Sequence, residues 1–159
     1  MKRIGTASSL SDAFNISDAD LNAIAGLAAS YYSEGKLEAS LKLLQGLVHL
    51  RPERGEYWSA LGATLTRLER YEEAVPVLSV ALSFDTKDMA ALVNRAECFL
   101  ALAQSESAAS DLDKAMTLDS KGSNPAANRA RQIAFGMKEF FEQCMESGLD
   151  TAEVEEKDL

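Results

Sequence analysis

Few side chains in this sequence could carry out catalytic chemistry. Its 159 residues include one histidine, His49, and two cysteines, Cys98 and Cys144. A catalytic triad needs a histidine beside its nucleophile, and His49 falls near the end of an expected helix, where an exposed position is the simplest interpretation. Cys98 lies in an apolar stretch, where a small buried residue suits packing, and no basic residue is placed to lower its pKa. We therefore expect no enzyme activity, no cofactor and no metal site.

The acidic side chains point to binding and not to acid–base catalysis. We interpret Glu38, the pair Glu72 and Glu73, and the pair Asp111 and Asp113 as solvated helix faces. The net charge of −9, from 25 acidic and 16 basic residues, leaves no cluster of lysine and arginine to neutralise phosphates. The same balance argues against anionic membrane surfaces. Nucleic acid and membrane are therefore not expected partners.

The sequence also limits where the protein works. No apolar run approaches the roughly 20 residues of a membrane span, and the start, MKRIGTASSLSDAF, lacks the apolar region of a secretory signal. Two cysteines far apart in sequence do not make a disulfide framework, which fits a reducing compartment. We expect a cytoplasmic protein.

The stretch from Gly55 to Asp88 indicates the elements that would position a binding site. It carries Trp58, Leu61 and Gly62 in a W-x2-L-G spacing, followed by a second run with small residues near large ones. This spacing is the tetratricopeptide signature, a helix-turn-helix unit in which small residues let two antiparallel helices approach closely. A single unit cannot bury its own faces, so neighbouring units are required.

Shifting the sequence by the length of that stretch in either direction finds those neighbours without gaps. The repeats are residues 21–54, 55–88 and 89–122. A small residue recurs at the tight crossing of the first helix, another small residue in the second helix, and a leucine four positions later. These sets are Ala28, Gly62 and Ala96; Ser40, Ala74 and Ala108; and Leu44, Leu78 and Leu112. The predicted fold is all-α, with three tandem tetratricopeptide repeats forming an α-solenoid. The alternative is an unrelated helical bundle with chance spacing.

The local signals predict where each element begins and ends. The repeats, within 17–122, should form helices over 18–33, 37–50, 55–68, 71–84, 89–102 and 105–118, with a bend but no break at Pro76. Asn124 and Pro125 start a long helix that ends near Glu146 and caps the stack, within a region that spans 123–148. Residues 1–16 should be a flexible arm with one helical turn between Ser9 and Phe14. Residues 149–159 should be an acidic, disordered tail.

In a stack of this kind the first helices of the pairs line a concave groove. The residues at positions two, five, nine and twelve of each repeat should face it, and their small side chains should leave room for an extended peptide. These candidate groove residues are Asn22, Ala25, Ala29, Tyr32, Ser59, Ala63, Thr66, Val93, Glu97 and Leu100, with Glu56 and Ala90 at equivalent positions. Tyr32, Val93 and Leu100 are the predicted apolar anchors.

One known use of such grooves does not fit the sequence. A clamp for a C-terminal carboxylate uses lysine, arginine and asparagine from the first helices. The corresponding positions here hold Ala25, Ala29, Ala60 and Ala90, with Asn94 as the one suitable residue. Glu56 and Glu97 would add negative charge, so we do not expect a carboxylate clamp.

The chain resembles the tetratricopeptide class II chaperones of bacterial type III secretion, which hold translocator proteins before export. The segment Leu27 to Lys36, LAASYYSEGK, is similar to the end of that family's first helix and its turn. Tyr57 to Ala63, YWSALGA, and Arg95 to Leu100, RAECFL, resemble two further family segments. The resemblance covers residues 17–120 well and the remainder by layout.

The resemblance implies a bacterial cytoplasmic chaperone whose groove takes an extended segment of a hydrophobic translocator and prevents its aggregation. It also implies a tendency to form homodimers, often through N-terminal elements, and for some members a role in transcription through a partner activator. A second hypothesis stands beside it: a general tetratricopeptide scaffold that joins other proteins.

Overall fold

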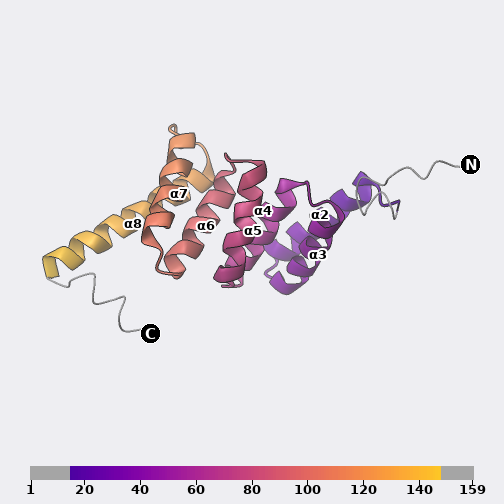
Figure 1. The fold of residues 1–159 in the computed structure, drawn as a ribbon, viewed down its shortest axis with the longest axis horizontal. Helices are drawn as coiled ribbons and strands as arrows, with labels where there is room; N and C mark the ends of the chain where they lie inside the picture. The colour runs from indigo at the N-terminus through magenta and orange to yellow at the C-terminus, as the bar shows by residue number, and fades with distance from the viewer. Residues whose placement is uncertain (1–14, 148–159) are drawn as a thin grey trace, which may run out of the picture.

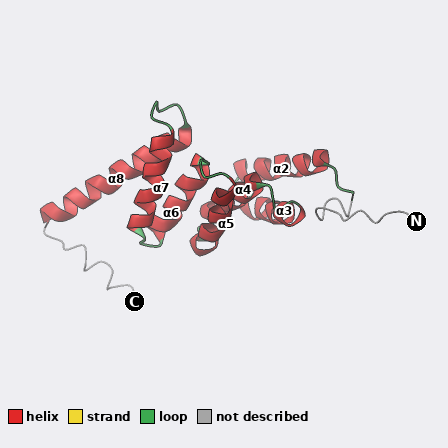
Figure 2. Ribbon diagram, turned by 45° about the horizontal axis from the view of Figure 1, so that its top comes forward, coloured by secondary structure: helices red, strands yellow, loops and turns green. Residues whose placement is uncertain are grey.

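The computed structural model describes residues 15–147, and this part of the chain is helical without strands (Figure 2). Most of the predicted arm and the whole predicted acidic tail lie outside the described residues, so those two expectations stay predictions. The helices are α2 (Asp18–Ser33), α3 (Leu37–Leu50), α4 (Gly55–Arg67), α5 (Tyr71–Phe84), α6 (Met89–Ala101), α7 (Ser105–Leu118) and α8 (Pro125–Ser147). Their bounds match the predicted ones to within one residue at nearly every end.

Local signals explain these bounds. Ser17 forms a capping box with Asp20: the Ser17 hydroxyl accepts from the Asp20 N–H, and the Asp20 carboxylate accepts from the Ser17 N–H. The first helix of each pair ends at a residue with positive φ, and these residues, Gly35, Glu69 and Ala103, are separated by one repeat length. At each of these ends an N–H bonds the carbonyl five residues earlier, as Lys36 does to Tyr31. The repeat in sequence is thus also a repeat in backbone conformation.

Small residues set the close packing within each pair. Ala28, Ala96 and Ser40 are fully or almost fully buried, and the Ser40 hydroxyl donates to the Ala28 carbonyl at 2.9 Å. A Cβ atom on Gly62 would overlap the side chain of Leu78 on the facing helix. The recurring small position is therefore required by the helix crossing, as the sequence predicted.

The helix pairs stack in chain order, which places α2 and α8 at opposite ends of the stack (Figure 1). α8 contacts α7 and α6 in the same way that α6 contacts α5 and α4. Ala130 on α8 follows Ala96 by one repeat length and is fully buried. α8 thus takes the place of the first helix of a fourth pair, which is how it caps the stack.

Two large apolar side chains of the first helices are partly exposed. Trp58 is half-buried at the edge of the core, with its Nε1–H donating to the Pro52 carbonyl at 2.7 Å, and the buried aromatic of this helix is Tyr57. Leu27 is 45% exposed because no helix pair precedes α2 within the described residues. At Pro76, α5 continues unbroken as expected, and the bend itself stays a prediction.

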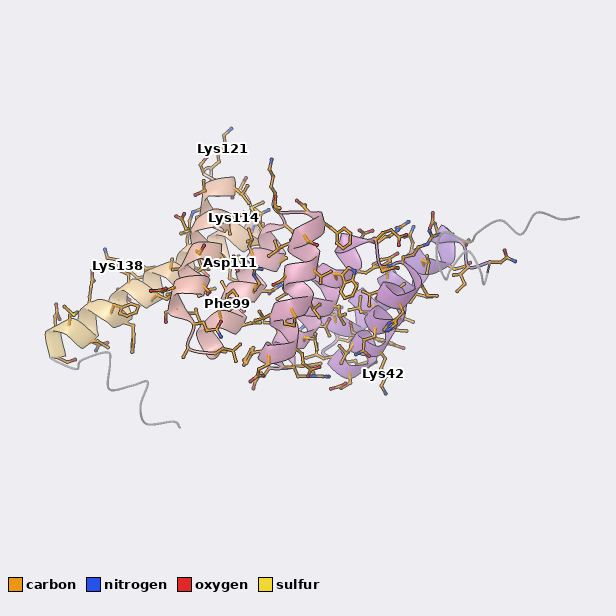
Figure 3. The ribbon with its side chains drawn as sticks, viewed as in Figure 1. Lys42, Phe99, Asp111, Lys114, Lys121 and Lys138 are labelled. Carbon is orange, nitrogen blue, oxygen red and sulfur yellow. The ribbon has the colours of Figure 1, made fainter. Side chains whose placement is uncertain are left out.

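The interpretation of Asp111 as a solvated residue was wrong. Its side chain is buried and accepts two hydrogen bonds from Arg95, at 2.7 Å from Nε and 2.8 Å from Nη2. Arg95 also donates to the Ser79 hydroxyl at 2.9 Å, so the group joins α5, α6 and α7. Figure 3 labels Asp111 where α7 faces α6, whereas Asp113 two residues on is exposed as predicted. A carboxylate can be buried here because the guanidinium satisfies both of its oxygens.

Candidate binding groove

A cavity of about 530 Å³ opens along the first helices of the stack. Its wall combines residues of α2, α4 and α6 with the first turns of α8, and side chains of α3 reach it from behind. Much of this wall is alanine, contributed by Ala25, Ala28, Ala29, Ala60, Ala63, Ala90 and Ala126. Side chains this small leave space above the helices, so the apolar surface of the cavity can be reached by larger side chains of another molecule.

The structure brings half of the predicted groove residues to this cavity, namely Ala25, Ala29, Tyr32, Ala63 and Val93. Val93 is almost fully buried, so it forms part of the wall and does not project from it. Thr66 and Glu97, together with Tyr32, line a second and more polar hollow beside the cavity. Asn22, Ser59 and Leu100 line neither hollow, and Leu100 packs partly against the core. Binding at these ten positions stays a prediction.

Polar contacts hold the rim between the two hollows. Arg129 on α8 pairs with Glu97 on α6 at 2.6 Å, and burial raises the pKa of Glu97 although Arg129 opposes that shift. The Arg67 guanidinium lies over the Tyr32 ring at 4.5 Å from its centroid and donates to the Tyr32 carbonyl at 2.8 Å. These contacts fix the Tyr32 ring, so it presents a rigid aromatic surface to the cavity.

Sequence reasoning missed several residues that line the cavity, and Arg129 and Tyr57 are two of these with polar groups. The sequence placed Arg129 in a capping helix. Arg129 follows Arg95 by one repeat length and stands next to Ala130, and this spacing marks α8 as a first helix of the same period. Tyr57 was not included among the groove positions. It lines the cavity, is almost fully buried, and its hydroxyl has no hydrogen-bond partner among residues 15–147. A buried hydroxyl without a partner is unfavourable, so a ligand that reached this donor would gain a hydrogen bond.

The side chains that first suggested chemistry do not form a reactive site. His49 is exposed in the last turn of α3, as expected, with Nδ1 2.6 Å from the Gln45 carbonyl oxygen. Cys98 is fully buried, as expected, and lies 3.2 Å from the Thr66 hydroxyl. Burial is the main cause that raises the pKa of the Cys98 thiol, which disfavours the reactive thiolate. Among the described residues, no group of acidic, histidine and cysteine side chains could hold a metal ion.

Solved structures match this arrangement of helices along most of the chain. The chaperone SycD of Yersinia enterocolitica, in complex with a peptide of the translocator YopD, has a TM-score of 0.69 and 26% identity. That match covers 80% of this chain and 96% of SycD. PcrH of Pseudomonas aeruginosa, in complex with the chaperone-binding region of PopB, has a TM-score of 0.67 and 27% identity over 73% of this chain and 95% of PcrH.

This chain has the fold of a type III secretion translocator chaperone. The predicted resemblance and the predicted α-solenoid are thereby confirmed. No protein-family model matches the sequence. Among curated proteins, mouse sperm-associated antigen 1 is 32% identical over 93 residues, which is 58% of this chain but 10% of the mouse protein. No helix between residues 15 and 147 is long and apolar enough to cross a bilayer.

Proposed function

We propose that this protein is a cytoplasmic chaperone of type III secretion that binds an extended apolar segment of a translocator protein in its groove. The observation that carries this proposal is the alanine-walled cavity along the first helices of a fold shared with SycD and PcrH. Both of those chaperones are seen with segments of translocators. A protein destined for a membrane exposes apolar surface, and covering one segment of it lowers self-association.

The wall of the cavity suits an extended chain. Small residues at Ala29, Ala60 and Ala63 leave pockets for apolar side chains of the cargo, while the Tyr32 ring, held by Arg67, offers an anchor surface. Polar groups of the second hollow, such as Asn94, lie next to these pockets and can bond the polar main chain of the cargo. Apolar pockets beside polar donors are the combination that an extended peptide requires.

The unpartnered hydroxyl of Tyr57 provides a more specific contact. An extended cargo segment in the cavity carries main-chain carbonyls that are freed of water on binding. We assign one of these carbonyls as the acceptor of the Tyr57 hydroxyl, because that donor is buried and otherwise unsatisfied. This hydrogen bond would strengthen binding whatever the cargo sequence, because its acceptor belongs to the main chain.

The scaffold hypothesis remains the second candidate. The observation that favours it is the match over 93 residues to mouse sperm-associated antigen 1. That match is independent of the solved chaperone structures. Translocator genes beside the gene for this protein would favour the chaperone.

Co-expression with candidate translocators, followed by affinity capture, tests the proposal. Ala63→Glu places bulk and an unpaired charge inside the cavity and should reduce capture at least tenfold. The matched control is Ala109→Glu, the same change at an exposed position of α7 outside the cavity, which should capture cargo normally. Tyr32→Ala should weaken capture and leave the fold intact by circular dichroism. Full capture by folded Ala63→Glu and Tyr32→Ala would exclude the groove as the site.

Tyr57→Phe separates binding from folding. Removing an unsatisfied buried hydroxyl should leave the free energy of unfolding unchanged or slightly higher, because no group within residues 15–147 bonds to it. Loss of its bond to cargo should weaken binding by about tenfold, which isothermal titration with a cargo peptide would measure. A variant that loses stability while binding normally would mean that the hydroxyl serves the fold instead.

A further inference from the structure

The first helix of the stack, α2, has a packing face that no described helix covers. In each first helix, the residues at positions three, seven and ten of the repeat form one stripe at helical spacing. The stripe is Tyr57, Leu61 and Thr64 in α4, and Ala91, Arg95 and Cys98 in α6, and all of these except Arg95 are buried. The equivalent residues of α2 are Ala23, Leu27 and Ser30, and all three are exposed, Leu27 by 45%. We call these three residues the α2 stripe.

Contacts of the later pairs show what belongs on such a stripe. α3 contacts α4 in the same way that α5 contacts α6. Arg95, at the seventh position in α6, donates to the Ser79 hydroxyl of α5 at 2.9 Å. Ser40 of α3 lines the cavity together with Tyr57 of α4. In both cases the stripe faces the second helix of the preceding pair, so a second helix is the element that fits the α2 stripe.

The sequence just before α2 keeps the register of a second helix. Counting back one repeat length from α3 reaches residues 6–14. Within this segment, Leu10 falls at the position of the recurring leucine, and Ala13 and Phe14 fall at two positions that are buried in α3 and α5. The aligned sets are Leu10, Leu44, Leu78 and Leu112; Ala13, Leu47, Ala81 and Ala115; and Phe14, Val48, Leu82 and Met116. The apolar positions of residues 6–14 are thus those with which second helices pack.

Polar residues take the outward positions of the same segment. Ser8 and Asp12 align with positions that are exposed in α3, α5 and α7. Apolar residues at the packing positions and polar residues at the outward ones are the pattern of an amphipathic helix in a stack. Asn15 then has a positive φ of 54°, a conformation in which asparagine commonly follows the end of a helix. Ile16 already packs partly against the core.

We propose that residues 6–14 form a helix that packs on the α2 stripe of the same chain and caps this end of the stack, as α8 caps the other end. Leu10 and Phe14 supply apolar surface to cover Leu27, and the small side chains of the stripe let the helix approach closely. The connection over residues 15–17 has the length that joins antiparallel neighbours. The proposal departs from the flexible arm that local signals predicted, because it uses the repeat register and the uncovered face of α2. It does not rest on the proposed chaperone function.

A double-mutant cycle in the full-length chain tests the contact. Phe14→Ser should lower the thermal midpoint by about 5 °C, because a buried ring is lost from the cap. Leu27→Ser should also lower it. The double variant should lose clearly less than the sum of the two, because each substitution removes the partner of the other. Losses that simply add would show that the two side chains are not in contact and would overturn the proposal.

Ile4→Ser is the matched control for Phe14→Ser. Ile4 is also a large apolar residue before α2, but it aligns with Glu38, Glu72 and Glu106, which are exposed in the first turns of the second helices. Its replacement should leave the thermal midpoint near that of the wild type. A loss as large as that of Phe14→Ser would show that the register of residues 6–14 is wrong.

Crosslinking tests where the segment lies. Ser11 and Leu27 precede the contacting residues Ser79 and Arg95 by two repeat lengths. A short bis-maleimide should therefore join Ser11→Cys to Leu27→Cys within one chain, in a protein that also carries Cys144→Ser to remove the more accessible native thiol.

Mixing isotope-labelled and unlabelled copies identifies which chain supplies the segment. Links within single copies are the expected result, with a much lower yield from the pair Ser8→Cys and Leu27→Cys, because Ser8 takes an outward position. Links found only between labelled and unlabelled copies would mean that a second copy covers α2. That result, or a folded protein that gives no link from Ser11→Cys, would overturn the proposal.

Discussion

The carboxylate of Asp111 has a role that its residue type alone does not indicate. It accepts hydrogen bonds from Nε and Nη2 of Arg95, while Nη1 of Arg95 donates to the Ser79 hydroxyl, and three consecutive helices are thereby joined. Residues 79, 95 and 111 are evenly spaced along the chain, at an interval that no local pattern predicts. The contact requires that α5 and α7, the second helices of adjacent pairs, both pack against the first helix α6. That arrangement belongs to the tertiary structure.

Asp111→Ala should lower the free energy of unfolding by about 2 kcal/mol. This loss is smaller than the roughly 3–5 kcal/mol for breaking a fully buried ion pair, because the Arg95 side chain is 22% exposed and can recover some hydration. Asp113→Ala provides the control, since Asp113 lies on the same helix and is exposed. Urea unfolding followed by circular dichroism would compare the two. Equal effects of both substitutions would show that the ion pair adds nothing specific.

At the scale of single residues, the sequence predicted which residue types line the groove. It predicted less well how deeply each of these residues is buried. Period and helical geometry placed Ala25, Ala29 and Ala63 correctly on the cavity wall. They could not show that Val93 is buried within that wall, or that Leu100 turns towards the core. These details follow from the rotation of each pair relative to the last, which changes the outward position from repeat to repeat.

At the scale of helices, the sequence predicted the bounds well because the signals are local. Ser17 and Pro125 mark helix starts through their own backbone chemistry, and the turn residues recur at the repeat period. Two of these turns use Glu69 and Ala103 in a left-handed conformation that favours glycine. The stack imposes that conformation on residues that do not prefer it, which composition alone would not have revealed.

Gly62→Ala should destabilise the fold although alanine favours helices. The added Cβ would overlap Leu78, which is fully buried and cannot move aside, so we expect a loss of about 1–3 kcal/mol. Gly46→Ala should do the opposite. Gly46 is exposed in the interior of α3 with nothing within 4 Å of its added Cβ, so the change should stabilise by about 0.5–1 kcal/mol. Thermal melts of both variants measure the difference in sign, and a stabilising Gly62→Ala would refute the close crossing.

The repeat register also explains why the sequence predicted only part of the role of α8. The sequence indicated a capping helix with one apolar face. The structure shows that its first turns complete the groove wall and that its last part extends past the stack. Helical periodicity identifies an apolar face, but it does not show how much of that face finds a neighbour.

At the scale of the whole molecule, stability should depend on the first part of α8, which caps the stack, and not on residues 138–147. A chain that ends after Ser123 loses Ala127 and Ala130 and exposes the apolar side of α6 and α7. Its free energy of unfolding should fall by about 2–4 kcal/mol, and it should aggregate. A chain that ends after Met137 keeps these contacts and should unfold near the wild-type midpoint in urea. Equal losses in the two truncations would contradict this division of α8.

The stack of helix pairs and the capping helix α8 form one continuous frame (Figure 1). Because each pair contacts its neighbours in the same way, a ligand laid along the first helices touches several pairs at once. That geometry suits an extended segment better than a compact ligand. Of the second helices, α3 contributes Ser40 and Leu44 to the cavity wall.

The most direct measurement is therefore photo-crosslinking of cargo from defined positions. A photoreactive phenylalanine analogue at Ala63, within the cavity, should crosslink a co-expressed translocator, and mass spectrometry should locate the link in one short segment of the cargo. The same analogue at Ser83, exposed on α5 and outside the cavity, should give no such link. Crosslinking from Ser83 and none from Ala63, in a complex that still forms, would contradict the claim that the groove holds the cargo.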